Sequence, residues 1–242
     1  MTKFTINGIE FNVGDGECGD FGCFNEGSAQ ATDIGPFGMI QEMRAFIRIQ
    51  DERKLRNLVD VGALFGVFSL VFTRYPDATA YAIEPSEPAF NGLLNNVLVN
   101  PDRHIIPLFT FAGEFEGEPI GCGVEWKHVV ARRFPDSPRV LYYPQRRLDL
   151  MDSIKKVDCI KIDVEGFECP VLRGAVGMIK KWKPIIFLEC HFSVLPEVSG
   201  DSNASLFDLI RSMGYTVNTF QGETVGTFEG LNGCRYVLEP ER

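Results

Sequence analysis

The stretch "LVDVGALFGVFSL", residues 58–70, decides the fold of this chain. An apolar run that contains a single carboxylate, Asp60, leads into Gly62, and Gly66 follows four positions later. A short apolar run that ends at glycine and continues at helical spacing predicts a buried strand that turns into a helix. The carboxylate and the glycines therefore stand where a parallel sheet binds its ligands.

Strand and helix patterns alternate through most of the chain. Apolar runs predict four further core strands, at 78–84, 104–111, 157–165 and 183–191. Apolar residues at helical spacing predict helices near 37–50, 66–74, 87–100, 168–182 and 203–213. Two closing strands, 215–220 and 234–239, are suited to an antiparallel pair. The alternation predicts an α/β fold, with helices on both faces of a parallel sheet and the first strand near its middle.

Two segments depart from this alternation. Residues 4–13 predict a hairpin around Asn7-Gly8, and with the loop that follows they form an N-terminal extension over 1–35. Residues 112–156 predict a long loop between the third and fourth core strands. We expect one domain over 36–242, with 112–147 an insertion on the ligand-binding side of the sheet.

The glycines suit a turn that approaches a ligand closely. Gly62 can adopt backbone angles closed to other residues, and Gly66 lets the next helix N-terminus approach an anionic group. Glu84 ends the next strand, where a carboxylate can accept both hydroxyls of a ribose. The G-x-G-x-x-G pattern of dinucleotide sites is absent from the chain. The combination predicts S-adenosylmethionine, with Asp60 offsetting positive charge near its methionine end; a tight turn with an incidental acid is the alternative.

A second group of ionisable residues ends the fourth and fifth core strands. Asp163 and Glu165 share one face of the fourth strand, and Glu189 and His191 share one face of the fifth. If these strands are neighbours, their axes lie about 4.8 Å apart. The four side chains would then line one wall of the crevice.

Each of these residues also has a structural interpretation. Glu165 and the glycine after it can simply turn the chain into the helix, with Glu168 favouring the N-terminal end of the helix dipole. His191 can be a hydrogen-bonded histidine at a strand end, and Lys161 can pair with a neighbouring carboxylate.

Taken together, these stretches resemble the FkbM-type S-adenosylmethionine-dependent methyltransferases. The resemblance spans roughly 56–215 and rests on 58–70, on "AIEPSEPAFNGLLNNVLVN" (82–100), on Leu148-Asp149, on "IKIDVEGFECPVLRGA" (160–175) and on "KPIIFLECH" (183–191). It implies the class I methyltransferase (Rossmann-like) fold, a mostly parallel seven-stranded sheet with one antiparallel strand. It also implies O-methylation of a hydroxyl on a sugar or secondary metabolite.

The resemblance also assigns expected roles to residues. Asp60, Gly62 and Gly66 would line the cofactor turn, Glu84 would hold the ribose, and Asp163 and Glu165 would stand at the catalytic end of the crevice. The family usually has Asn where this chain has Leu64, and losing that amide removes a polar contact to the cofactor or the turn. Residues 112–139 match no part of the family pattern, so the acceptor does not follow from it.

Methyl transfer to an alcohol needs a group that removes the hydroxyl proton during attack. We expect Asp163 or His191 to take it, which with Glu165 makes Asp163, Glu165 and His191 the predicted catalytic residues. We expect no metal; a divalent cation held by Asp163, Glu165 and Glu189 is the alternative.

Three other functions compete with this interpretation. The missing G-x-G-x-x-G disfavours a nicotinamide-dependent oxidoreductase. A formal charge of −9, from 24 basic and 33 acidic residues, disfavours a nucleic-acid methyltransferase. That class also needs an (Asn/Asp)-Pro-Pro-aromatic turn or a Pro-Cys nucleophile, which the chain lacks. A catalytically silent nucleotide-binding module is favoured by Leu64 and Phe65.

Composition bounds the setting of the protein. Its 242 residues, 45% of them hydrophobic, suffice for a full core. The seven cysteines form no C-x-x-C pair and their number is odd, which indicates a reduced protein. No apolar stretch reaches about 18 residues, and the N-terminus is polar. We expect a cytoplasmic protein whose partner is a small hydroxylated acceptor, without nucleic acid or membrane.

Overall fold

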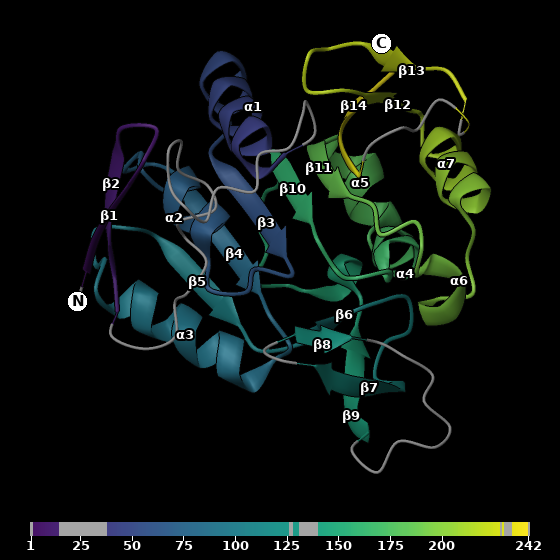
Figure 1. The fold of residues 1–242 in the computed structure, drawn as a ribbon, viewed down its shortest axis with the longest axis horizontal. Helices are drawn as coiled ribbons and strands as arrows, with labels where there is room; N and C mark the ends of the chain where they lie inside the picture. The colour runs from purple at the N-terminus through teal and green to yellow at the C-terminus, as the bar shows by residue number, and fades with distance from the viewer. Residues whose placement is uncertain are drawn as a thin grey trace.

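The computed structural model describes residues 2–14, 38–125, 128–130, 140–227, 229 and 234–241. Within them, one large sheet of eight strands forms the centre of the molecule (Figure 1). In spatial order its strands are β13 (Thr224–Val225), β12 (Tyr215–Asn218), β14 (Arg235–Pro240), β11 (Ile185–Glu189), β10 (Cys159–Ile162), β3 (Asn57–Val61), β4 (Thr79–Ile83) and β5 (Ile105–Leu108).

The strand directions confirm the predicted fold class. The strands from β11 to β5 are parallel to one another, and β14 runs antiparallel to both β11 and β12. The predicted seven strands are therefore present with one antiparallel member, and β13 adds an eighth at the edge beside β12. As expected, β3 lies inside the sheet, between β10 and β4. The strand that contains Pro107, β5, is an edge strand, also as expected.

Helices cover both faces of this sheet, as predicted. One hydrophobic core contains residues of α1 (Met39–Arg53), α2 (Val67–Phe72) and α3 (Glu87–Leu98). The other contains residues of α4 (Glu168–Gly174), α5 (Val176–Trp182), the short α6 (Leu195–Val198) and α7 (Asn203–Ser212). The single helix expected over 168–182 is two helices, α4 and α5, which meet at Ala175.

The two cores follow from the alternation of side chains along each strand. Leu58 packs in the core of α1 to α3, whereas its neighbour Val59 packs in the core of α4 to α7. A strand covered on both faces reads as a nearly continuous apolar run because every side chain is buried. Asp60 and Lys161 break this run, and they are register partners on β3 and β10. This pair marks the part of the core where charge is buried.

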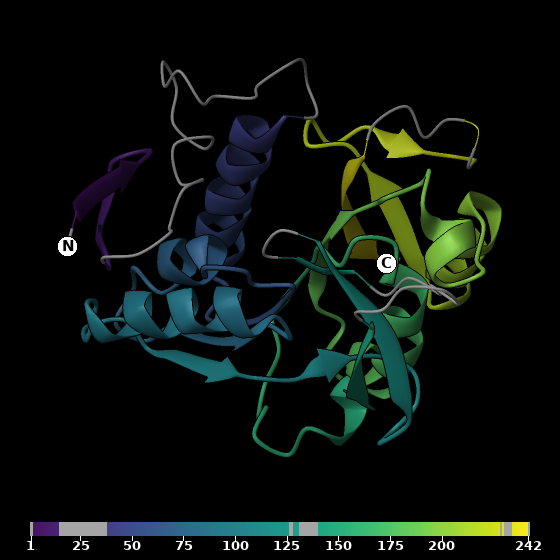
Figure 2. The same cartoon turned by 60° about the horizontal axis from the view of Figure 1, so that its bottom comes forward.

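The N-terminal hairpin has the predicted form. β1 (Thr2–Ile6) pairs with β2 (Ile9–Val13), and Asn7 and Gly8 between them both have positive φ. Figure 2 shows the hairpin beside α3, at one side of the molecule. Asn100 Oδ1 accepts a hydrogen bond from the backbone N–H of Asn12 at 2.7 Å, which attaches the hairpin to the end of α3. The loop expected over 14–35 lies outside the described residues apart from residue 14.

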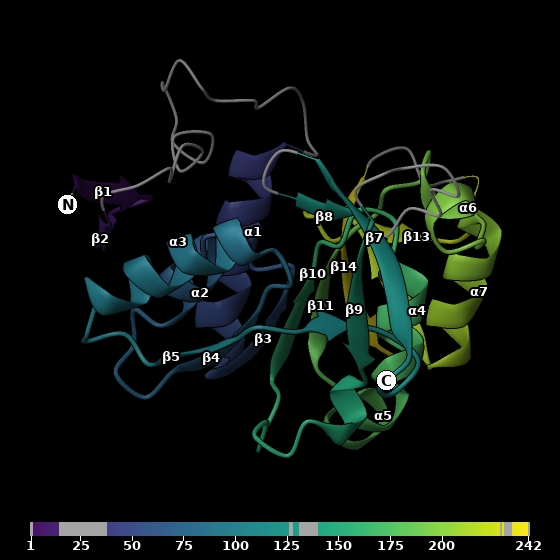
Figure 3. The ribbon, with the colours of Figure 1, turned by 90° about the horizontal axis from the view of Figure 1, so that it is seen from below.

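The prediction of a long loop over 112–156 is wrong. This part of the chain forms a second sheet in the order β6 (Phe111–Ala112), β9 (Val140–Arg146), β7 (Pro119–Glu125) and β8 (His128–Val130) (Figure 3). The 3-10 helix η2 (Leu148–Leu150) then leads back to the main sheet. Pro119 and Pro144 are register partners in β7 and β9, so neither residue donates a ladder hydrogen bond there. These prolines, with the glycines of β7, concealed the strand pattern.

Two general expectations concern redox state and membranes. The cysteines at 122, 159, 169, 190 and 234 are all free thiols. Among the described residues, no helix has the length and apolar character needed to cross a membrane.

Candidate active site

A cavity opens at the carboxyl ends of β3, β4 and β10, where the sequence predicts the ligand site. It is lined by Val61, Gly62, Leu64, Ile83, Glu84, Pro85, Phe111, Ala112, Asp163, Val164, Glu165 and Phe167. The cavity therefore brings together the predicted cofactor residues Gly62 and Glu84 and the predicted catalytic residues Asp163 and Glu165.

The turn after β3 needs its glycines for two different reasons. Gly62 has φ +79°, and a Cβ there would stand 1.8 Å from the carbonyl oxygen of Asp163. Gly66 has φ +81°, and its Cβ would stand 2.5 Å from Leu93 Cδ1 of α3. The first glycine lets the ends of β3 and β10 meet at the cavity, and the second lets α2 pack against α3.

Glu84 joins this turn to the turn after β4. Its Oε2 accepts a hydrogen bond from Leu64 N at 2.9 Å, and its Oε1 accepts one from Ser86 N at 2.8 Å. Burial raises the pKa of Glu84 to about 7, although these two hydrogen bonds favour the charged form. The carboxylate thus has a structural role in addition to the ligand-binding role predicted for it.

Leu64 adopts the left-handed region, with φ +51°. Asn enters this region several times more often than other residues with side chains, because its short polar side chain tolerates it. The left-handed backbone therefore gives a further reason for the family's Asn at this position, beside the polar contact to the cofactor or the turn that the sequence suggested.

Asp60 lies deeper than the sequence predicted. It is 2% exposed, it accepts a hydrogen bond from Ser69 Oγ at 2.7 Å, and it is not among the residues that line the cavity. Burial raises its pKa to about 6, against the effects of Ser69 and Lys161. The carboxylate therefore connects β3 to α2 beneath the turn.

Lys161 is the centre of a buried charge cluster behind the cavity. Its Nζ lies 3.1 Å from Glu42 Oε1, 3.5 Å from Asp163 Oδ2 and 3.8 Å from Glu189 Oε2. Arg235 contacts both Glu42, at 3.0 Å, and Glu189, at 2.5 Å. The ion pair that the sequence suggested for Lys161 is therefore present, with three carboxylate partners.

These contacts set the protonation of the two acids at the strand ends. Burial opposes the ionisation of Asp163, but the charges of Lys161 and His191 bring its pKa below the ordinary value. Burial and the charge of Asp163 raise the pKa of Glu189 to about 8. Asp163 is therefore the more acidic member of the pair.

His191 lies just beyond the end of β11 and faces several carboxylates. Its Nδ1 is 2.7 Å from Glu168 Oε1, and its Nε2 is 3.4 Å from Glu165 Oε2 and 3.8 Å from Asp163 Oδ1. Burial works against its protonation, but the hydrogen bond to Glu168 and the charges of Asp163 and Glu165 raise its pKa to about 9. His191 does not line the cavity itself, although Asp163 and Glu165 beside it do.

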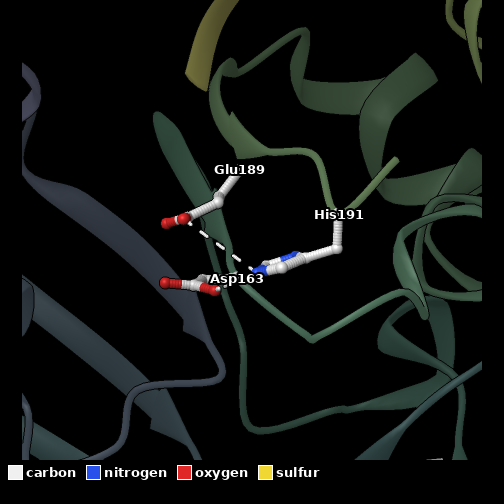
Figure 4. A group of neighbouring side chains, drawn as sticks. All are labelled: Asp163, Glu189 and His191. Atoms are coloured by element: carbon white, nitrogen blue, oxygen red, sulfur yellow. Dashed lines mark ion pairs between the residues drawn. The ribbon is translucent and has the colours of Figure 1, made fainter. Parts of the chain in front are cut away.

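Asp163, Glu189 and His191 also have the residue types of a metal site. One ligand atom from each lies within 4.8 Å of the others, and Figure 4 shows the three side chains pointing toward one another. However, both carboxylates already have a cation beside them. Lys161 Nζ lies 3.5 Å from Asp163 Oδ2, and Arg235 Nη2 lies 2.5 Å from Glu189 Oε1. A divalent cation would have to overcome repulsion from these two buried cations.

Four contributors to the site were not singled out from the sequence. Glu42 lies on α1 and Arg235 on β14, far from the motifs in sequence, and no local pattern identifies them. Phe111 of β6 and Phe167 line the cavity together, with ring centroids 5.2 Å apart.

Comparison with known proteins identifies the family. Residues 60–217, more than half of the chain, match the Methyltransferase FkbM domain. This chain is a member of the FkbM methyltransferase family. The cofactor of the family is S-adenosylmethionine, in agreement with the prediction from the β3 turn and Glu84.

Individual relatives of this FkbM chain are distant. "Methyltransferase 1" of Beauveria bassiana is 27% identical over an aligned length of 142, and the match covers 48% of this chain and 57% of that protein. The crystal structure of Methyltransferase FkbM from Methylobacillus flagellatus is 21% identical with a TM-score of 0.46, over 75% of this chain and 43% of that one. The chain thus spans about half the length of these relatives. An O-methyltransferase from Bacillus cereus in complex with SAH has a TM-score of 0.43 and 13% identity, over 88% of this chain and 84% of that one.

Proposed function

We propose that this FkbM chain is an S-adenosylmethionine-dependent O-methyltransferase that acts on a hydroxyl of a small acceptor of the sugar or secondary-metabolite type. The observation that supports the proposal is one shared cavity, whose lining includes Gly62 and Glu84 as well as Asp163 and Glu165. A cofactor-binding part and a proton-accepting part in one cavity suit transfer between two bound molecules.

The groups that line the cofactor-binding part suit a nucleoside. Glu84 would hold the ribose hydroxyls, since each of its oxygens accepts one backbone hydrogen bond and retains a second acceptor site. Gly62 would keep the β3 turn free of a side chain beside the amino-acid tail, with Gly66 shaping the turn through its left-handed backbone and Asp60 supporting it through Ser69. When bound, S-adenosylmethionine supplies an electrophilic methyl carbon, whose bond to sulfur breaks with the electron pair staying on sulfur as the acceptor oxygen attacks.

The part of the cavity lined by Asp163 and Glu165 would bind the acceptor and remove its proton. Asp163 and Glu165 line the cavity, and His191 Nε2 lies within 4 Å of both. A positioned base contributes roughly 10²–10⁴-fold to the rate of such a step. These three residues are therefore our candidates for the catalytic group.

The inserted sheet would form the acceptor side of the cavity. Phe111 and Ala112 of β6, at the start of the 112–147 insertion, line the cavity beside Phe167. Their apolar surface suits the body of an organic acceptor, and the formal charge of −9 favours a small neutral molecule over nucleic acid.

Calorimetry followed by an acceptor screen tests this function. We expect S-adenosylmethionine and S-adenosylhomocysteine to bind the full chain, and methyl release to appear over a panel of hydroxylated sugars and phenols. Glu84→Ala should weaken cofactor binding, whereas His191→Gln should retain it and lose turnover. Absence of binding at millimolar nucleoside would refute the proposal; binding without transfer to any acceptor would favour the silent module.

A further inference from the structure

We propose that Glu168 is a positioning residue, which holds His191 by Nδ1 and so makes Nε2 the atom that takes the proton of the acceptor hydroxyl. The inference rests on the proposed function and deepens it, because it selects one base among the three candidates and adds a residue to which the sequence assigned only a structural role.

The contacts of Glu168 carry the argument. Its side chain is 0% exposed, and its Oε1 lies 2.7 Å from His191 Nδ1. The same oxygen accepts the backbone N–H of Gly166 at 3.1 Å and that of His191 at 3.3 Å. One carboxylate oxygen therefore fixes both the backbone and the ring of His191. Since Nδ1 faces an acceptor, the neutral ring carries its proton there and leaves the lone pair on Nε2.

The backbone after β10 brings Glu168 to this place. Glu165 and Gly166 both have positive φ, +52° and +96°, which reverses the chain directly after the strand. Glu168 then begins α4 next to the end of β11, where a carboxylate also suits the helix dipole. A side chain in the left-handed region is costly, and such positions concentrate at functional sites.

The other end of the imidazole faces the cavity wall. Nε2 is 3.4 Å from Glu165 Oε2 and 3.8 Å from Asp163 Oδ1, and both residues line the cavity. These separations exceed those of good hydrogen bonds, and the described residues provide Nε2 with no closer partner. Once the ring is neutral, as the pH rises through about 9, an acceptor hydroxyl between these groups can donate its proton to Nε2.

Asp163 is the weaker candidate for the base. Its Oδ2 lies 3.5 Å from the buried Lys161 ammonium, so it is held as the charged partner of an ion pair. Taking a proton would weaken that pair, whereas Glu168 stabilises His191 once it is protonated. In the proposed step the proton moves from the acceptor oxygen to Nε2, and Glu168 neither gains nor loses one.

Several charged groups other than Glu168 act on the titration of His191. Asp163 and Glu165 come from the turn after β10, Glu189 comes from β11 at 4.0 Å, and Lys161 and Arg235 lie behind these acids. A change at Glu168 must therefore be compared with the wild type in the same background of charges.

Nuclear magnetic resonance of the 15N-labelled full chain tests the inference without an acceptor. The chain has three histidines, so His191→Gln assigns the ring signals of residue 191. We expect the neutral ring of the wild type, populated above about pH 9, to carry its proton on Nδ1. Glu168→Gln, which keeps the shape but removes the charge, should lower the His191 pKa by about one unit or more. Glu197→Gln, which changes an exposed glutamate of α6, is the matched control and should change neither the tautomer nor the pKa of His191.

Two results would overturn the inference. One is a neutral wild-type ring protonated on Nε2, and the other is an unchanged His191 pKa in Glu168→Gln. Glu168→Ala removes the acceptor entirely and should mix the two tautomers; if that variant does not fold, Glu168→Gln still decides.

Kinetics with an acceptor from the screen then connect the ring to turnover. Glu168→Gln should lower kcat by about 10²-fold with KM for S-adenosylmethionine unchanged, and should shift the rising limb of the pH profile with the measured pKa of His191. Wild-type kcat in this variant would refute the positioning role. Failure of the chain to bind S-adenosylmethionine would refute the proposed function instead, while the resonance data would still report on Glu168 and His191.

Discussion

The ammonium nitrogen of Lys161 lies 3.1 Å from Glu42 Oε1, and both side chains are at most 2% exposed. Two charges this deep are costly to bury, and their attraction offsets that cost only while both are present. The pair joins α1 to β10 directly behind Asp163, so it supports the cavity wall from inside the core.

We expect Lys161→Met to lower the free energy of unfolding by about 3–5 kcal/mol, because Glu42, Asp163 and Glu189 lose a buried counter-charge. Lys156→Met is the matched control: Lys156 pairs with Asp158 at 3.1 Å but is 56% exposed, so about 1 kcal/mol or less is expected. Urea unfolding of both variants measures the difference. Equal losses of unfolding free energy in the two variants would show that burial of the Lys161 charge is unimportant.

Gly62→Ala should destabilise the protein by about 3 kcal/mol or more, because it combines a left-handed backbone with overpacking against the Asp163 carbonyl. Gly8→Ala separates the two effects. Gly8 has the same φ of +79° with nothing within 4 Å of the added Cβ, so only about 1–2 kcal/mol is expected. Thermal unfolding measures both variants, and an equal decrease in their melting temperatures would contradict this account.

At Leu64 a glycine variant should be more stable than an alanine variant, the reverse of the usual order. Both Leu64→Gly and Leu64→Ala lose the same packing, but only glycine adopts φ +51° without strain, so the glycine variant should be more stable by about 1 kcal/mol. Leu64→Asn should fall between them. Denaturant midpoints give the order, and an alanine variant at least as stable as the glycine variant would exclude the backbone explanation.

Stability should fall at high pH through His191. Its folded pKa of about 9 exceeds the model-peptide value of 6.5, so its contribution is fully present below about pH 6.5 and is lost as the pH rises through about 9. The contribution is on the order of 3 kcal/mol, since one unit corresponds to about 1.4 kcal/mol. Unfolding of the wild type and of His191→Gln between pH 6 and 10 measures it. A constant difference between them across this range would argue against a raised pKa.

Removal of divalent cations should leave the protein unchanged. Lys161 and Arg235 already neutralise the carboxylates of the Asp163, Glu189 and His191 group, so millimolar EDTA should alter neither the melting temperature nor cofactor affinity. Calorimetric titration with Mn²⁺ is the complementary measurement. Binding that disappears in Glu189→Gln would establish a metal site there.

Much of the fold follows from local pattern. Apolar runs with glycine ends predicted the parallel strands and the helices between them, because burial on both faces leaves a continuous apolar signature. The sheet of β6 to β9 was missed because its prolines and glycines hide that signature.

By itself the sequence determined the parallel sheet, the Gly62 turn and the adjacency of Asp163 and His191, since these depend on neighbouring residues and on the order of strands. Only the tertiary structure decided that Asp60 faces Ser69 in the core, that Glu42 and Arg235 neutralise the Lys161 cluster, and that Glu168 reaches His191 across 23 positions of chain. The physical reason is that burial and charge pairing depend on which distant side chains share one low-dielectric space, and sequence spacing carries no record of that.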